Sequence, residues 1–457
     1  MNTQNVPDLI VRGKRVVRGG GVAPAAIQVR AGKITAIAPL NAVGPRCPIY
    51  DAGESVVMPG IVDTHVHINE PGRAEWEGFQ TATRAAAAGG VTTLIEMPLN
   101  SIPATTSVKG VREKLRAAEG KLCVDVGFWG GVIPGNSREL RGLWDAGVFG
   151  YKCFLAPSGV DEFPFVGESE LRVALPELAS MGAVLLVHAE LPGPIEKAGA
   201  ALSNANWTKY STWLASRPRA AENEAIELMI RLAREYGART HIVHLSSSDA
   251  IPMLRRARAE GVRVTVESCP HYLRFAAEEI ADGATEFKCA PPVRESENRE
   301  KLWSALGDGV IDLIATDHSP CPPEMKCKPA GDFSKSWGGV ASLELSLPAT
   351  WTEAREHGYS LGHLARWLCA EPARLAGLET RKGAIAVGYD ADFVIWNPAK
   401  TFRVEGEKLH QRHKLTPYAG CELAGVVEAT FLRGKKIFDR GEFSADTSGS
   451  VLLRGRN

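Results

Sequence analysis

The chain has no excess charge of either sign, although it is 457 residues long. Lysine and arginine together number 53, and aspartate and glutamate together also number 53, so the formal net charge is zero. A protein that binds nucleic acid or an anionic membrane through its overall electric field needs a surplus of basic residues. We therefore expect neither a nucleic-acid partner nor a membrane partner.

We also expect neither a signal peptide nor a membrane-spanning segment. The residues Met1–Asp8 lack the charged and apolar regions of a signal peptide, and no apolar run reaches the length of a membrane span. The nine cysteines are an odd number scattered over a long chain, which is typical of reduced thiols. Cys321 and Cys327 do not have the spacing of a C-x2-4-C zinc loop. These absences predict a cytoplasmic location.

The middle of the chain alternates apolar strand-like runs with helical stretches such as Glu168–Met181 and Glu222–Tyr236, which is typical of parallel β/α architecture. Eight such units predict an α/β fold, a closed (β/α)8 TIM-type barrel with its site at the carboxyl ends of the strands. An open doubly wound sheet is the alternative, although no G-x-G-x-x-G motif follows a strand. The predicted strands are Val56–Thr64, Val91–Glu96, Cys123–Phe128, Val148–Phe154, Ala183–His188, Thr240–Leu245, Val262–Glu267 and Ile311–Thr316.

Both ends of the chain differ from the middle, because they contain short strands separated by glycine-rich turns. Ala26–Arg30 and Lys33–Ile37 are examples near the start, and Ala391–Trp396 and Gly425–Leu432 are examples near the end. We expect the two ends to pair into one small β-sandwich domain. The predicted domains are residues 1–55 with 385–457 for this sandwich and residues 56–384 for the metal-binding barrel.

Side chains that can bind metal ions follow several of the predicted strands. An H-x-H on a strand, here His65 and His67, places both imidazoles on one face because side chains alternate with period two. A single histidine at the end of a strand is more often a hydrogen-bonded framework residue than a metal ligand. Several such residues at the mouth of one barrel instead favour a metal site. The predicted set is His65, His67, Lys152, His188, His244 and Asp317.

Lys152 does not fit a metal site as an ammonium, which has no lone pair and repels a cation. One interpretation is a salt bridge or a phosphate contact. The other is carbamylation by carbon dioxide, which would turn the side chain into an anionic carboxylate able to bridge two metals. The spacing leaves both open. Imidazole and carboxylate together suit zinc, cobalt, manganese or iron.

Two further histidines lie near the predicted strand ends. His241 precedes His244 by three residues, so in a strand it points to the opposite face, and we expect it to serve in packing. His271 follows the seventh predicted strand, and we expect it to reach either the substrate or the surroundings of a metal ligand.

Longer strings around these residues resemble the cyclic-amidohydrolase branch of the amidohydrolase superfamily, which includes allantoinases, hydantoinases, dihydropyrimidinases and dihydroorotases. The resemblance extends over nearly the whole chain, and the strings are most similar to those of the allantoinases. They are Trp76-Glu77-Gly78, Ile95–Asn100, Lys152–Leu155 with Ser158–Pro164, Glu267–Tyr272, Asp317–Lys326 and Trp337-Gly338-Gly339.

The resemblance implies hydrolysis of the hydantoin ring amide of allantoin to allantoate, by a hydroxide that bridges two divalent ions, zinc before cobalt, manganese or iron. Asp317 would take the proton of the hydroxide and deliver it to the leaving ring nitrogen. A homotetramer is implied as well. The implied metal ligands are His65 and His67 for the more buried ion, His188 and His244 for the more exposed ion, Asp317 for the first ion and carboxylated Lys152 for both. The expected substrate contacts are Asn100, Ser158, His271 and the main chain at Ala290 and Gly338.

Two departures bear on the substrate. Asn69 stands where dihydroorotases carry an arginine for the substrate carboxylate, and asparagine cannot make that charge-assisted contact. Hydantoinases carry a tyrosine shortly after the lysine, whereas Phe154–Ser158 contains none, so the helper for the oxyanion beyond the metals is open. A hydantoinase-type or dihydropyrimidinase-type cyclic amidase is the alternative function. A non-enzymatic scaffold is a third possibility, against which the complete set of predicted ligands argues.

Overall fold

A closed ring of parallel strands forms the core of the barrel in the computed structural model, which describes residues 6–42, 47–445 and 448–455. Two sheets make up the ring, with strand orders β6-β7-β8 and β14-β13-β12-β11-β10-β9. Most of these strands are buried along their whole length, as parallel strands covered on both faces should be. The strands are β6 (Ile61–Val66), β7 (Val91–Glu96), β8 (Asp125–Phe128), β9 (Gly130–Gly131), β10 (Tyr151–Phe154), β11 (Val184–His188), β12 (Arg239–Ile242), β13 (Val264–Ser268) and β14 (Leu313–Ile314).

Hydrogen bonds join the two sheets at both seams. On one side the amide of Phe149 donates to the carbonyl of Phe128 at 3.0 Å. On the other side the amide of His67 donates to the carbonyl of His318 at 2.8 Å, and Val66 forms a parallel bridge with His318. The closed (β/α)8 barrel predicted from the alternating pattern is therefore confirmed.

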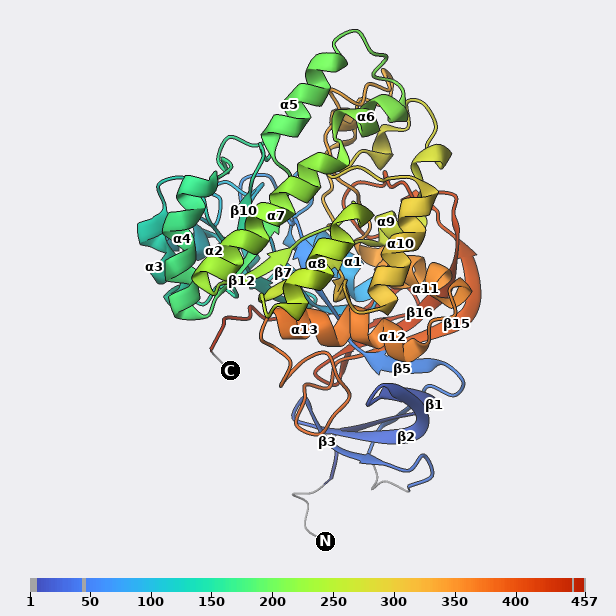
Figure 1. The fold of residues 1–457 in the computed structure, drawn as a ribbon. Helices are drawn as coiled ribbons and strands as arrows, with labels where there is room; N and C mark the ends of the chain where they lie inside the picture. The colour runs from blue at the N-terminus through green and yellow to red at the C-terminus, as the bar shows by residue number, and fades with distance from the viewer. Residues whose placement is uncertain (1–5, 43–46, 446–447, 456–457) are drawn as a thin grey trace.

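Helices cover the outside of the ring (Figure 1). The helix predicted over Glu168–Met181 is present with the same bounds, and its apolar residues at helical spacing are buried. No helix of the described residues is long and apolar enough to cross a membrane. The helices are α1 (Phe79–Ala88), α2 (Val108–Ala118), α3 (Leu140–Ala146), α4 (Glu168–Met181), α5 (Pro192–Ala201), α6 (Tyr210–Ser216), α7 (Arg219–Tyr236), α8 (Ile251–Ala259), α9 (Pro270–Arg274), α10 (Ser296–Gly307), α11 (Ser346–Glu356), α12 (Leu361–Ala365) and α13 (Glu371–Leu375).

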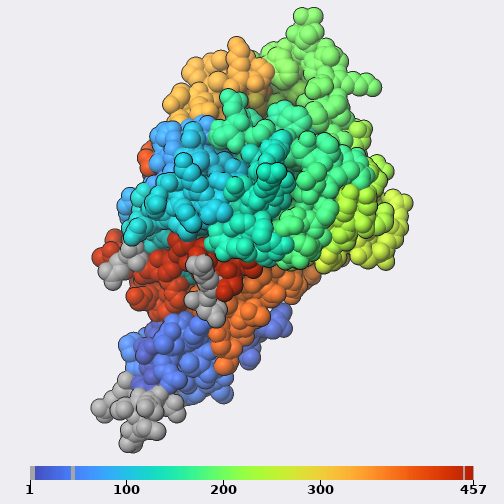
Figure 2. Space-filling view, turned by 90° about the vertical axis from the view of Figure 1, so that its left-hand side faces the viewer, coloured from blue at the N-terminus to red at the C-terminus, as the bar shows by residue number. Residues whose placement is uncertain are grey.

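A further sheet is built from both ends of the chain, as the turn-rich termini predict. Its strand order is β18-β17-β16-β15-β5-β1-β2-β3, with β4 beside β1. Figure 2 shows the C-terminal chain in red between the blue lobe of N-terminal strands and the barrel. The strands are β1 (Leu9–Arg18), β2 (Gly21–Arg30), β3 (Lys33–Ala38), β4 (Ile49–Asp51), β5 (Val56–Pro59), β15 (Phe393–Arg403), β16 (Glu422–Leu432), β17 (Lys435–Asp439) and β18 (Glu442–Phe443).

The first predicted strand, Val56–Thr64, consists of two strands that belong to different sheets. β5 pairs with β1 and β15, whereas β6 pairs with β7. The chain changes sheet at Gly60, where a Cβ atom would lie 2.3 Å from Oγ1 of Thr92, so only glycine allows this close approach. The Pro59-Gly60 pair in this apolar run is the one local sign of the change. The domain boundary at residue 56 stays a prediction, and the strand pairing supports Gly60 as the point of entry into the barrel.

Candidate metal centre and substrate cavity

Three side chains that can bind a metal meet at the carboxyl end of the barrel strands. His65, His244 and Asp317 each offer one ligand atom, and these atoms lie within 4.8 Å of one another. Oδ1 of Asp317 lies 3.1 Å from Nε2 of His65 and 3.4 Å from Nε2 of His67. All four residues are buried. A carboxylate oxygen that faces two imidazole nitrogens is placed to share a metal ion with them.

His188 and His244 form a second pair on the neighbouring side of this group. Nδ1 of His188 lies 3.0 Å from Nε2 of His244, and the two ring centroids are 4.7 Å apart. Nδ1 of His244 has no hydrogen-bond partner among the described residues. Two imidazole nitrogens that face each other, together with a buried nitrogen without a partner, fit ligands for a cation better than a closed hydrogen-bond network.

Lys152 extends from β10 and is fully buried. Among the residues that the structure describes, its Nζ has no hydrogen-bond partner and no carboxylate within ion-pair distance. Burial lowers the pKa of Lys152 to about 8. The salt-bridge interpretation of this lysine therefore has no described partner, and a buried amine left unpaired is costly unless it is changed chemically or binds something.

The backbone is strained where the site needs its side chains. His244, Asp317 and Asn100 have φ angles of 40°, 45° and 68°, in the left-handed region that non-glycine residues rarely adopt. Such conformations cost about 1–3 kcal/mol each and cluster at functional sites. These conformations turn the chain sharply beyond the strand ends, and no local sequence pattern predicts them.

Two buried glutamates hold the histidines in place, and the sequence reasoning did not assign this role to either. Glu267, at the end of β13, contacts Nδ1 of His65 and lies 3.0 Å from Nε2 of His241. His241, which we expect to serve in packing, is fully buried and in addition shares this carboxylate. Glu190 lies 2.8 Å from Nε2 of His188. A carboxylate on one ring nitrogen fixes the orientation and tautomer of the imidazole and leaves the other nitrogen for a metal.

The charge states of these groups suit metal binding. Burial lowers the pKa of His67 to about 4 and also lowers the pKa values of His188 and His244, so these rings are neutral at pH 7 and keep a lone pair. Burial acts to raise the pKa of Asp317, but the neighbouring imidazoles, His65 foremost, hold it well below its usual value. Neutral imidazole and ionised carboxylate are the forms that ligate metals.

A cavity of about 500 Å³ opens above the histidines. It brings together four of the five predicted substrate contacts, Asn100, Ser158, Ala290 and Gly338. The fifth, His271, does not line it, and both of its ring nitrogens are buried without a hydrogen-bond partner among the described residues. Other lining residues that the sequence reasoning missed are Trp213, Arg217, Lys288 and Ser319.

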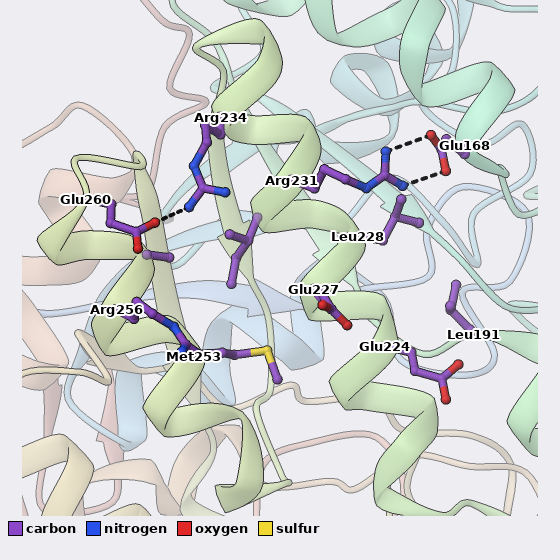
Figure 3. A pocket seen from close by; sticks show the side chains of 12 residues that line it. Glu168, Leu191, Glu224, Glu227, Leu228, Arg231, Arg234, Met253, Arg256 and Glu260 are labelled. Atoms are coloured by element: carbon purple, nitrogen blue, oxygen red, sulfur yellow. Dashed lines mark hydrogen bonds and ion pairs between the residues drawn. The ribbon is translucent and has the colours of Figure 1, made fainter.

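A larger groove of about 720 Å³ lies on the outer surface, against α7 and α8 (Figure 3). Arg231 pairs with Glu168 across it at 2.7 Å, and Arg234 pairs with Glu260. Its lining contains acidic, basic and aliphatic side chains but no histidine or cysteine. The groove therefore lacks the imidazole ligands that the barrel mouth provides.

The chain belongs to the amidohydrolase family, whose family model matches residues 56–437. It is 52% identical to the allantoinase of Streptomyces avermitilis over 448 residues, which cover 98% of this chain and 99% of the relative. It is 42% identical to the allantoinase of Arabidopsis thaliana, with 97% of this chain and 90% of the relative covered.

Among solved structures, the L-hydantoinase (dihydropyrimidinase) from Arthrobacter aurescens aligns with a TM-score of 0.93 at 34% identity, covering 98% of this chain and 100% of that one. The family resemblance predicted from the strings is confirmed, and the chain is a hydrolase of cyclic amides that carries a divalent-metal site.

Glu267→Gln should weaken metal binding about 10–100-fold, because a neutral amide cannot hold both His65 and His241 as the carboxylate does. Metal affinity is measured by competition with a chromogenic chelator. Glu260→Gln, on the surface at the end of α8, is the matched control and should bind metal like the wild type. A wild-type affinity in Glu267→Gln would show that this carboxylate does not support the site.

Proposed function

We propose that this protein hydrolyses the hydantoin ring amide of allantoin to allantoate, in the degradation of purine nitrogen. The observation that carries the proposal is the similarity to allantoinases over nearly the full length of the chain. A cavity of about 500 Å³ is large enough for a substituted five-membered ring. The cluster of histidines with Asp317 lies at its wall, where the reacting amide would be held.

The proposed centre holds two divalent ions, zinc first, with cobalt, manganese and iron as alternatives that the same donors accept. When bound, such a pair supplies a hydroxide at neutral pH and polarises the carbonyl of the substrate. The unpaired amine of Lys152 and the unpaired nitrogen of His244 support the proposal. The proposed ligands are His65, His67 and Asp317 for one ion, His188 and His244 for the other, and carboxylated Lys152 for both.

Asp317 is the proposed catalytic residue, because the ring nitrogen must be protonated to leave when the amide C–N bond breaks. The carboxylate is ionised and lies 3.1 Å from His65 and 3.4 Å from His67, so it can accept a proton where the nucleophile would form. Delivery of that proton to the ring nitrogen completes the cleavage of the C–N bond.

Main-chain groups and short polar side chains are the proposed substrate contacts. Oδ1 of Asn100 has no hydrogen-bond partner among the described residues and is free to accept one. The hydroxyl of Ser158 donates within its own loop, to the carbonyl of Phe163 at 2.6 Å, and accepts from the amide of Val160 at 3.4 Å, which leaves the main chain of Ser158 for a ligand. Ala290 and Gly338 offer only main chain. A direct contact by His271 stays a prediction, as do the homotetramer and the cytoplasmic location.

A hydantoinase-type amidase is the second candidate, favoured by the TM-score of 0.93 to an L-hydantoinase. We would assay metal-reconstituted protein on allantoin, hydantoin, dihydrouracil and dihydroorotate and measure metal content on the same sample. Preference for allantoin with about two metals per chain is expected. Preference for another ring would support the proposed hydrolysis of a cyclic amide but would replace allantoin as the substrate. Neither activity nor metal, after reconstitution with bicarbonate, would overturn the catalytic proposal.

Asp317→Asn should lower kcat on allantoin at least about 100-fold while the protein remains folded, since the amide cannot accept or deliver the proton. Metal content is measured alongside, so that loss of metal can be told apart from loss of proton transfer. Asp308→Asn, an exposed change, is the control and should leave kcat unaltered. Turnover retained in Asp317→Asn would remove Asp317 from this role.

Lys152→Ala should lose the shared ligand and with it most of the bound metal and activity. Short carboxylic acids such as acetate or propionate should restore part of both, because they can occupy the space of the missing carboxylate. The same concentrations of chloride salt provide the control. Full metal occupancy in Lys152→Ala, with no response to the acids, would argue against carboxylation.

A further inference from the structure

Lys326 is a buried cation without a carboxylate partner. Lys326 is only 5% exposed, and it forms no ion pair with any of the described residues. Lys114 and Lys382, which are also buried, each pair with a carboxylate, Glu96 and Asp392 respectively. An ammonium buried without a counter-charge is costly, so its remaining contacts have to compensate.

Main-chain carbonyls from two loops provide those contacts. Nζ of Lys326 donates to the carbonyl of Gly339, to that of Trp337 at 3.0 Å and to that of Lys288 at 3.4 Å. The amide of Gly339 also donates to the carbonyl of Lys288 at 2.8 Å. One ammonium therefore ties the loop of residues 288–290 to the loop of residues 336–339, and both loops line the substrate cavity.

A second buried lysine holds the same loop from another side. Nζ of Lys288 donates to the carbonyl of Ser336 at 2.5 Å and lies 4.4 Å from the ring centroid of Trp213. Of the four carbonyls in residues 336–339, those of Ser336, Trp337 and Gly339 are thus bound by ammonium groups. The loop is held through its backbone, and rotation of its peptide units would break charge-assisted bonds.

Because the peptide bond is planar, fixing the carbonyl of Trp337 also fixes the direction of the Gly338 N–H. In a trans peptide the carbonyl and the N–H of one unit point in opposite directions. Since the carbonyl of Trp337 points at Lys326, the N–H of Gly338 points away from Lys326. Gly338 lines the cavity, and its N–H has no acceptor among the described residues. An oriented donor without a partner is therefore present beside the substrate space.

We propose that Lys326 is a positioning residue for substrate binding, whose ammonium fixes the Trp337–Gly338 peptide so that the Gly338 N–H donates to a carbonyl oxygen of the cyclic amide. The inference rests on the proposed function, because it takes the ring as the ligand. Lys326 itself touches no substrate. A neutral isostere of Lys326 would leave the carbonyls of Trp337 and Gly339 without a donor and free the Trp337–Gly338 peptide to rotate.

Lys326→Met tests the proposal in the metal-loaded enzyme. We expect KM for allantoin to rise about 3- to 10-fold, the loss of roughly one hydrogen bond, with metal content unchanged. Lys328→Met, a more exposed lysine two residues away that pairs with Glu286, is the control and should keep the wild-type KM. A purely structural role would lower Tm and the active fraction but would leave KM unaltered, and that result would overturn the proposal.

A double-mutant cycle with Gly338 tests whether Lys326 acts through the N–H. Gly338→Pro removes this donor, whereas Gly338→Ala keeps it, and a Cβ there meets no atom within 4 Å. In the Gly338→Pro background, Lys326→Met should change KM less than twofold. An equal rise in both backgrounds would overturn the proposal.

Alternative variants and substrates are available if Lys326→Met does not fold or if allantoin is not the preferred ring. Lys326→Gln replaces Lys326→Met if the latter does not fold, and its shorter amide should give an intermediate KM; an unchanged KM would again overturn the inference. If the wild type prefers another ring over allantoin, the proposed substrate is wrong and the same cycle is run on the preferred ring. Where turnover is too slow, the dissociation constant of the substrate is measured by calorimetry.

Discussion

The hydrogen bonds of Asp63 join β6 to the segment just after β14, and the ends of these two segments carry half of the proposed metal ligands. Its carboxylate accepts from the hydroxyl of Thr316 at 2.6 Å, from the amide of Thr316 at 3.3 Å and from the amide of His65 at 3.1 Å. A shift of one residue between paired strands would turn every side chain to the other face. This buried carboxylate thus fixes the register in which His65 and His67 meet Asp317.

Charge balance at the barrel mouth favours an anionic form of Lys152. The carboxylates of Asp317, Glu267 and Glu190 are buried there, and the last two are bound by imidazoles. Two divalent ions would add four positive charges, and an ammonium at the fully buried Lys152 would add a fifth. Carboxylation would reverse that charge and turn repulsion into ligation. The lowered pKa of Lys152, caused by burial, leaves more of the neutral amine that reacts with carbon dioxide.

The sequence allowed us to predict those site residues that alternate along one strand or directly follow an apolar strand. The H-x-H of His65 and His67 and the apolar run before Asp317 are patterns of this kind, and the barrel followed from eight repeats. Gly60 could not be assigned, because its role depends on Thr92 thirty-two residues away. The pairing of Glu267 with His65 spans 202 residues and is likewise invisible to a local pattern.

Main-chain groups and side chains of the cavity would serve different purposes: the main chain would bind the ring amide, and the side chains would select the substituent. The N–H of Gly338 can hold the amide of any cyclic ring, since every such ring presents a carbonyl oxygen in the same place. A contact of this kind gives affinity but cannot distinguish allantoin from hydantoin. Selectivity requires side chains that meet the substituent on the ring, and Trp213, Arg217 and Lys288 line the cavity wall, although Arg217 also pairs with Glu190 at 2.5 Å. Because Lys288 also fixes the Ser336 carbonyl, a change at this wall would be transmitted to the loop that holds the ring.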